Sequence, residues 1–202
     1  VDPRTVGLSN IDELDIVSFC KRESYLTSFD WTITDPAKTL LFNSKVCPTM
    51  FVTSAPSSAM LQTPMCHVSQ LFQYWCGSIK FRFQIVATNF HKGRLKLTYD
   101  PNTAKTGNYD AINVAYTRII DIAKDKDFEI VFNWAQPNAY KPVLEIDAGL
   151  DVAIYRADGT TLNDDLMDYM NGAFSIEVLN ELSAPTSTGT ISINVFVSAC
   201  DD

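Results

Sequence analysis

Only two histidines, His67 and His91, occur in the 202 residues, and no apolar run approaches the roughly 18 residues of a membrane span. Histidine is the usual general base in nucleophilic catalysis, and no serine or cysteine lies in a Gly-x-Ser-x-Gly elbow. Two separated histidines also cannot build the histidine-rich metal site of a cupin enzyme. We therefore predict that the chain is not an enzyme and has no catalytic, cofactor-binding or metal-ligating residues. His91 falls in a predicted turn, where a backbone-bonded turn residue is favoured over a pH switch.

Paired cysteines are also missing. The five cysteines form no Cys-x-x-Cys motif, and their number is odd: Cys20, Cys47, Cys66, Cys76 and Cys200. A secreted disulfide framework has an even and denser set, so we expect reduced thiols that serve as small apolar residues in a protein folded in the cytosol. A zinc site is disfavoured for the same reason.

Positive charge is scarce, because 16 basic residues stand against 24 acidic ones and give a net charge of −8. A broad nucleic-acid-binding face requires clustered lysine and arginine, so such a face is disfavoured. Five basic residues alternate along the middle of the chain and offer local contacts to RNA: Lys80, Arg82, Lys92, Arg94 and Lys96. The favoured interpretation is that they form the solvated or interfacial side of strands.

The acidic residues Asp158, Asp164, Asp165 and Asp168 lie in one glycine-bearing stretch. They lack the spacing of a dedicated calcium loop, so a solvated surface loop over 158–171 is favoured over a calcium site. The chain begins with Val1 rather than methionine and shows no targeting pattern, which suggests a chain cut from a longer precursor or otherwise trimmed.

The most informative stretch is 72–101, which contains two runs of alternating apolar and polar residues. Residues 79–87 and 94–99 follow a period of two and are joined by the polar link 88–93. Such alternation predicts two strands, each with one buried and one solvated side, so that Phe81 faces the core and Lys80 faces away.

The rest of the chain adds further strands and little helix. Strands are predicted at 25–34, 39–42, 46–53, 115–123, 128–134, 174–179 and 191–199, with two short ones within 143–155. In the first strand, Tyr25, Phe29 and Trp31 are expected on one side and Leu26 on the other. A helix is predicted at 66–75, a helical turn at 10–16, and a loop at 56–64. The uninterrupted alternation of 191–199 predicts a central strand.

This pattern predicts an all-β fold, an eight-stranded antiparallel jelly-roll β-sandwich with one or two short helices. An immunoglobulin sandwich is the rival, but it predicts a shorter chain and more even spacing. Exposed tryptophans could make a jelly roll bind carbohydrate. Trp31, Trp75 and Trp134 instead fall at positions expected to face the core.

The order of motifs resembles one family. An aromatic entry with Trp75-Cys76-Gly77, a basic strand, Phe90-His91-Lys92-Gly93-Arg94, a second strand and Asp100-Pro101 resemble the middle of the capsid proteins of picorna-like positive-strand RNA viruses, with those of insects, algae and diatoms nearest. Residues 11–16 and 25–31 resemble the entry into these barrels. The likeness extends over most of the chain.

The resemblance implies a non-enzymatic coat protein that assembles with copies of itself and with sibling jelly-roll subunits. In this family, three related subunits build a pseudo-T=3 icosahedral shell around an RNA genome, and the shell is assembled in the host cytoplasm. Genomic RNA at the inner face and a host receptor are further implied partners. We expect a lead-in segment at 1–24 and a jelly-roll capsid domain at 25–202. The entry Asp12-Glu13-Leu14-Asp15 resembles subunits around the threefold axis.

Overall fold

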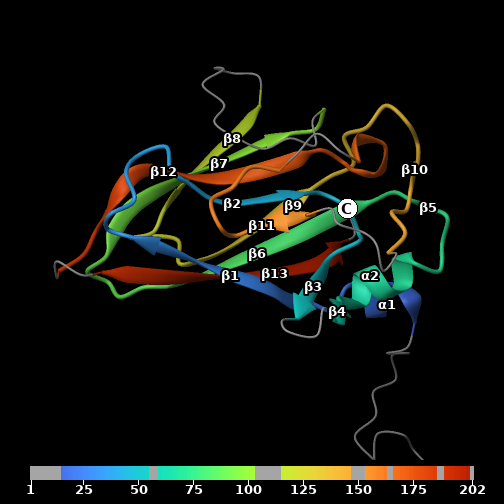
Figure 1. Cartoon of the computed structure of the whole chain (residues 1–202), viewed down its shortest axis with the longest axis horizontal. Helices are drawn as coiled ribbons and strands as arrows, with labels where there is room; N and C mark the ends of the chain where they lie inside the picture. Colours follow the sequence, from blue (N-terminus) through green and yellow to red (C-terminus); the bar gives the residue numbers. More distant parts are fainter. Residues whose placement is uncertain are drawn as a thin grey trace, which may run out of the picture.

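The computed structural model describes residues 15–54, 59–102, 115–146, 153–162, 166–185 and 189–200. Two antiparallel sheets pack face to face (Figure 1). The first contains, in spatial order, β1 (Ser24–Thr32), β13 (Thr190–Cys200), β6 (Ser78–Val86) and β9 (Asp127–Phe132). The second contains β11 (Tyr155–Arg156), β2 (Leu40–Lys45), β12 (Ala173–Ser183), β7 (Lys92–Asp100) and β8 (Tyr116–Asp121).

The path of the chain identifies the sandwich type. Among the eight strands of six residues or more, the chain crosses to the opposite sheet at every connection except that from β7 to β8. Repeated crossing between two antiparallel sheets is the jelly-roll arrangement, so the predicted fold class is confirmed. The predicted central strand is confirmed too, because β13 pairs with both β1 and β6.

An aromatic layer fills the space between the sheets. Phe81 and Phe174 lie edge to face with centroids 4.9 Å apart, and Phe132 stacks on Phe174 at 4.7 Å. Phe42 and Phe83 join the same layer at 6.1 Å from each other. These rings come from both sheets, so the alternating phase predicted for β6 is confirmed: Phe81 and Phe83 point inward. Aromatic pairs in such geometries stabilise the core beyond their buried area.

The first strand departs from the predicted phase. The pairing of β1 with β13 shifts between Tyr25 and Thr27, which marks a β-bulge. Leu26 is buried and Tyr25 is exposed, while Phe29 and Trp31 are buried as expected. An extra residue in one strand reverses the side-chain phase across the bulge. The assignment of Leu26 and Tyr25 to their sides was therefore wrong.

Helices and short strands gather at one end of the sandwich, which we call the helix end (Figure 1). It carries α1 (Ile16–Cys20), α2 (Pro64–Ser69), the pair β5 (Tyr74–Trp75) and β10 (Lys141–Pro142), and the hairpin β3 (Phe51–Ser54) and β4 (Ala59–Gln62). The opposite end carries the links 33–39, 87–91 and 122–126 and the residues that flank the β12–β13 link; we call it the turn end.

The predicted helix at 66–75 was misplaced. Thr63 caps α2 by accepting a hydrogen bond from the Cys66 amide at 3.2 Å, and Pro64 starts the helix. The helix ends at Ser69, and Leu71 is exposed. Proline is favoured in the first turn of a helix, so the helix begins before the apolar spacing suggests. The predicted loop 56–64 is likewise wrong at 59–62, which is β4, while 56–58 lie outside the described residues.

Part of the predicted surface loop 158–171 is anchored in the fold. Leu162, Met170 and Asn171 are buried, and residues Met167–Tyr169 form a short 3₁₀ helix. Lys141 donates hydrogen bonds from Nζ to the carbonyls of Met167 (2.8 Å) and Met170 (2.7 Å). The loop is therefore a surface loop only in part. Asp164 and Asp165 lie outside the described residues.

The remaining boundaries differ by a few residues. The predicted strand 46–53 begins only at Phe51, because Val46–Met50 carry the chain past Pro48. Of the two strands predicted within 143–155, only β11 appears among the described residues, and it starts at Tyr155. The helical turn predicted at 10–16 overlaps the described residues only at Asp15 and Ile16, where Asp15 caps α1.

Candidate functional site

The two histidines lie at opposite ends of the sandwich. His67 is exposed in α2, with Nδ1 3.4 Å from Oε1 of Gln62. His91 lies in the link between β6 and β7, where its Nδ1 accepts from the Thr88 amide at 3.2 Å and lies 2.8 Å from the Thr88 hydroxyl. The prediction of a turn residue bonded to nearby backbone is therefore confirmed. Neither histidine makes a hydrogen bond to a carboxylate or a cysteine among those of the described residues.

The cysteines divide by burial. Cys47 and Cys66 are buried free thiols, whereas Cys76 is exposed. Burial raises the pKa of both thiols to about 12, which keeps them protonated and unreactive. Across the described ranges, no three histidine, cysteine, aspartate or glutamate side chains gather as a metal-binding group. No helix in that same part of the chain is long and apolar enough to cross a membrane.

Two of the three tryptophans are less buried than predicted. Trp31 lies in the core, but Trp75 and Trp134 are half-buried and pack edge to face at 4.9 Å. Their indole N–H groups donate to the carbonyls of Tyr169 (3.1 Å) and Asn138 (2.9 Å). Both rings are thus engaged in intramolecular packing, which is a poor basis for a flat sugar-binding platform.

The five alternating basic residues do not form one face. Lys80 and Arg82 lie on the outer side of the first sheet, whereas Lys92, Arg94 and Lys96 belong to β7 in the second sheet. Four of them are ion-paired with carboxylates: Lys80 with Glu129, Arg82 with Glu23 and Asp127, Arg94 with Asp121, and Lys96 with Glu177. This distribution supports the interpretation as solvated strand sides rather than as a nucleic-acid-binding surface.

Arg82 makes several contacts on the outer side of the first sheet. Its guanidinium donates two hydrogen bonds to Asp127, at 2.7 and 2.6 Å, and a third to Glu23 at 2.7 Å. The same group lies 5.5 Å from the ring centroid of Phe196, which meets Tyr25 edge to face at 5.7 Å. The hydrogen bonds from Arg82 hold the pKa of Asp127 below its usual value.

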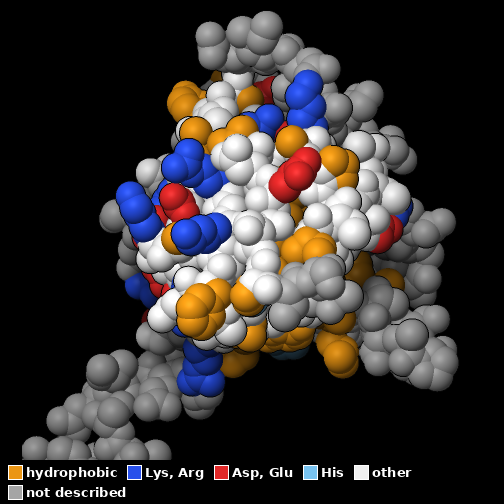
Figure 2. All heavy atoms as spheres, turned by 90° about the vertical axis from the view of Figure 1, so that its left-hand side faces the viewer, with side chains coloured by type: hydrophobic (Ala, Val, Ile, Leu, Met, Phe, Trp, Pro, Cys, Tyr) orange, Lys and Arg blue, Asp and Glu red, His pale blue; other side chains and the backbone are white. Residues whose placement is uncertain are grey.

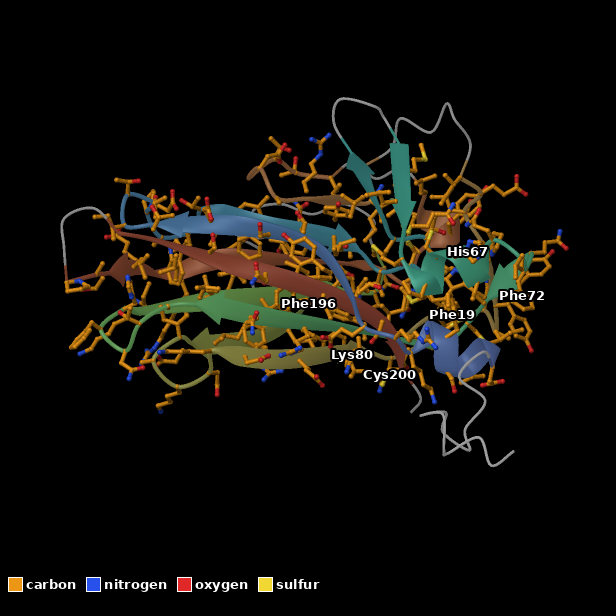
Figure 3. The ribbon with its side chains drawn as sticks, turned by 90° about the horizontal axis from the view of Figure 1, so that it is seen from below. Phe19, His67, Phe72, Lys80, Phe196 and Cys200 are labelled. Carbon is orange, nitrogen blue, oxygen red and sulfur yellow. The ribbon has the colours of Figure 1, made fainter. Side chains whose placement is uncertain are left out.

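Exposed apolar side chains gather at the helix end. Figure 3 shows Phe19, His67 and Phe72 there. The exposed members of this helix-end surface are Ile16, Val17, Leu61, Leu71, Phe72, Tyr74, Tyr140 and Met167. Apolar side chains in contiguous exposed patches mark interaction surfaces. This surface could not be predicted from a helix at 66–75, which includes Leu71 and Phe72. Thr63-Pro64 was the signal for the earlier helix start.

A groove lies between β8 and β9, which are edge strands of the two sheets. It has a volume of about 450 Å³ and is lined by Tyr99, Tyr116, Ile130, Phe132 and Trp134 among others. The two strands are the edges of different sheets, so the groove marks one lateral side of the sandwich. The other lateral side is formed by β1 and β11.

These features make surfaces for contact with other proteins and supply no reactive constellation within the described residues. Comparison with known proteins agrees. The family model of the picornavirus capsid protein matches residues 43–127. The chain is 26% identical over 193 residues to the structural polyprotein of cricket paralysis virus, which covers 87% of the chain. The chain spans only about a fifth of that polyprotein, 20% of its length.

Similarity to solved virus structures supports the same family assignment. A chain in the structure of a marine algae virus of the order Picornavirales superimposes with a TM-score of 0.88 at 33% identity, covering 100% of this chain and 77% of that one. A chain of black queen cell virus, with a TM-score of 0.79 and 20% identity over 100% of this chain and 77% of its own, shares the fold. The chain therefore belongs to the picornavirus capsid protein family and is a structural coat protein of a virus particle.

Proposed function

We propose that this chain is one of three related jelly-roll subunits that build a pseudo-T=3 icosahedral shell around an RNA genome in the host cytoplasm. Residues 1–24 would form the lead-in segment and 25–202 the shell domain, with no catalytic or metal-binding residue. The similarity to the algal virus chain supports this proposal. The observation that carries it is the helix-end surface, which leaves large apolar side chains in water when the subunit is alone.

The helix-end surface has the composition of a protein–protein contact. Leu71 is 69% exposed and Tyr140 is 63% exposed. Phe72 and Tyr74, just before and within β5, are exposed as well. Aromatic side chains are enriched at the centres of such interfaces, and each buries about 150–250 Å². A stable contact covers about 800 Å² on each partner, so a few such side chains with their polar surroundings suffice. A sibling subunit is the proposed partner.

The enclosed genome would be contained by the shell rather than held by the two sheets. Lys80, Arg82 and Lys96 each form an ion pair with a carboxylate of the same chain. A paired cation neutralises less phosphate charge and releases fewer counterions, so it adds little to RNA affinity. Contacts with the genome are therefore proposed to lie outside the solvated sides of these strands.

The test is co-expression of this chain with its sibling subunits, followed by electron microscopy and sedimentation. The double variant Leu71→Ser/Phe72→Ser should fold normally, since both side chains are exposed, but should reduce particle yield at least ten-fold. Val86→Ser is the matched control, because Val86 is 58% exposed near the turn end and should leave the yield unchanged. Wild-type yield from the double variant would contradict the assignment of this surface, and a wild-type chain that enters no particle would contradict the function.

A further inference from the structure

One lysine at the helix end holds a loop through the backbone of that loop. Lys141 of β10 donates hydrogen bonds from Nζ to the carbonyls of Met167 at 2.8 Å and of Met170 at 2.7 Å. Both carbonyls belong to the segment 166–170, which precedes β12 and contains the short 3₁₀ helix. Hydrogen bonds from a charged donor are roughly twice as strong as those between neutral groups. The ammonium group therefore fixes this segment more firmly than two neutral donors would.

A tryptophan on the neighbouring strand binds the same segment. Trp75 of β5 donates from its indole N–H to the Tyr169 carbonyl at 3.1 Å. Trp75 and Lys141 are directly opposite each other in the β5–β10 pair, so their side chains lie on the same side of it. The strand pair lies at the helix end (Figure 1). Two adjacent side chains thus bind three carbonyls of one short segment, and we call them the clip.

The held segment includes an unfavourable backbone conformation. Leu166 has a φ of +75°, in the left-handed region, although it is not a glycine. Such a conformation persists only where the surrounding structure imposes it. Within the segment, the backbone supplies two hydrogen bonds, from Tyr169 to Leu166 at 3.0 Å and from Met170 to Met167 at 3.4 Å. Among the bonds that the described residues give this segment, the three from the clip are the larger share.

The parts joined by the clip carry members of the helix-end surface. Tyr140 precedes Lys141, Tyr74 precedes Trp75, and Met167 lies in the held segment. All three are large apolar side chains that stay exposed. They come from distant parts of the chain, so their relative positions depend on the strand pair and on the bonds from the clip.

A pocket lies beside these side chains. It has a volume of about 440 Å³ and is lined by Phe72, Gln73, Pro142 and Tyr169 among others. Because Trp75 binds the Tyr169 carbonyl, the clip fixes one wall of this pocket. Residues that dominate the affinity of an interface cluster in well-packed pockets near its centre. The clip therefore determines the shape of a part of the surface that is suited to receive a partner.

We propose that Lys141 is a positioning residue for assembly, which holds the helix-end surface in the shape that binds a sibling subunit. The proposal rests on the proposed coat function and names the residue that prepares one of its contacts. A surface that already has its bound shape loses less conformational entropy on association. Without the clip, the segment 166–170 would have to become ordered during each encounter, and association would be slower.

The first test follows the segment in the full chain. Lys141→Met keeps an apolar side chain but removes the ammonium donor. Hydrogen exchange in peptides that cover 166–170 should become faster, by about ten-fold, while exchange in β6 and β13 stays as in the wild type. Lys126→Met is the matched control, because Lys126 Nζ donates to Asn89 at 2.6 Å at the turn end, the end that Figure 2 faces. Unchanged exchange at 166–170 in Lys141→Met would overturn the proposal.

The second test measures assembly with the sibling subunits. Lys141→Met should slow particle formation, followed by light scattering, by about ten-fold. Its melting temperature should stay close to that of the wild type, because Met170 remains buried and keeps the segment attached to the core. A merely structural role would instead lower the melting temperature and the particle yield together. That result, or assembly of Lys141→Met at the wild-type rate, would overturn the proposal.

Two further variants test whether hydrogen-bond donation is what matters. Lys141→Arg retains a charged donor and should restore most of the assembly rate. Trp75→Phe keeps an aromatic ring without the N–H group, and it should slow assembly less than Lys141→Met because it removes one bond rather than two. If Lys141→Arg melts normally but assembles as slowly as Lys141→Met, donation to the carbonyls is not the cause and the proposal is wrong.

The outcomes separate the role of Lys141 from the coat function. A wild-type chain that enters no particle contradicts the coat function itself. If the wild type and Lys141→Met assemble equally well, the coat function remains supported and only the positioning role is overturned. Lys126→Met should assemble like the wild type. An equal slowing by Lys126→Met and Lys141→Met would show that the effect is not specific to the clip.

Discussion

The two sides of strand β6 differ in what they do for the molecule. On the inner side, Phe81 and Phe83 are fully buried and contact rings from both sheets. On the outer side, Lys80 and Arg82 stay partly exposed and pair with carboxylates of neighbouring strands. Adjacent residues of this strand therefore have different roles. The inner side decides whether the chain folds, and the outer side decides what the folded chain presents to its surroundings.

The largest loss of stability is expected when a charged side chain replaces an apolar one on the inner side of β6. Phe81→Asp puts an unpaired carboxylate into the aromatic layer, at a cost of several kcal/mol or more. That is comparable with the whole stability of a domain, about 5–15 kcal/mol. We expect little soluble protein and no cooperative thermal transition, as measured by expression yield and circular dichroism.

The neighbouring residue supplies the control. Lys80→Asp removes an ion pair with Glu129 whose side chains are 25% and 52% exposed. Exposed pairs contribute about 0–1 kcal/mol, so this variant should remain folded with a small shift in melting temperature. Equal behaviour of Phe81→Asp and Lys80→Asp would show that the assignment of inner and outer sides to β6 is wrong.

An intermediate loss of stability is expected from a substitution at Asn171, a buried residue in the loop before β12. The Asn171 side chain donates to the Asn133 carbonyl at 2.9 Å and accepts from the Ala135 amide at 3.1 Å. Asn171→Ala removes both bonds of a fully buried side chain, and each hydrogen bond contributes about 0.5–1.5 kcal/mol net. Urea unfolding should show a lower midpoint with an unchanged slope. Asn102→Ala, at an exposed position, is the control and should leave the midpoint in place.

The sequence predicts those strands in which apolar and polar residues alternate regularly. In β6 and β13, alternation extends over most of the nine and eleven residues, so a period of two identifies the strands and their phase. It fails where one residue breaks the repeat. The bulge beside Leu26 reverses the phase in β1, and nothing in the residue types there distinguishes a bulge from a regular strand.

Surfaces are harder to predict, because they depend on residues far apart in the chain. Lys141 and Trp75 come together only through the pairing of β10 with β5, and they anchor a loop some 26 residues further on from Lys141. Phe90 falls in a predicted turn, but its exposure of 73% could be found only from the structure. The family resemblance predicted the coat function, whereas the contact surfaces required the tertiary arrangement.

The smallest effect is expected at the Arg82 cluster on the outer side of β6. Arg82 lowers the pKa of Asp127, so the folded pKa lies below the ordinary aspartate value of about 3.9. This pair therefore stabilises the fold above that ordinary value, and its contribution is lost as the pH falls through the folded pKa. Asp127→Asn should lower the urea midpoint slightly at pH 7, by less than Asn171→Ala, because the Asp127 side chain is 42% exposed to screening water. In acid, wild type and variant should converge. A gap that widens on acidification would mean that Asp127 is stabilising in its protonated form, and the outer side would then contribute to folding in a way its ion pairs do not explain.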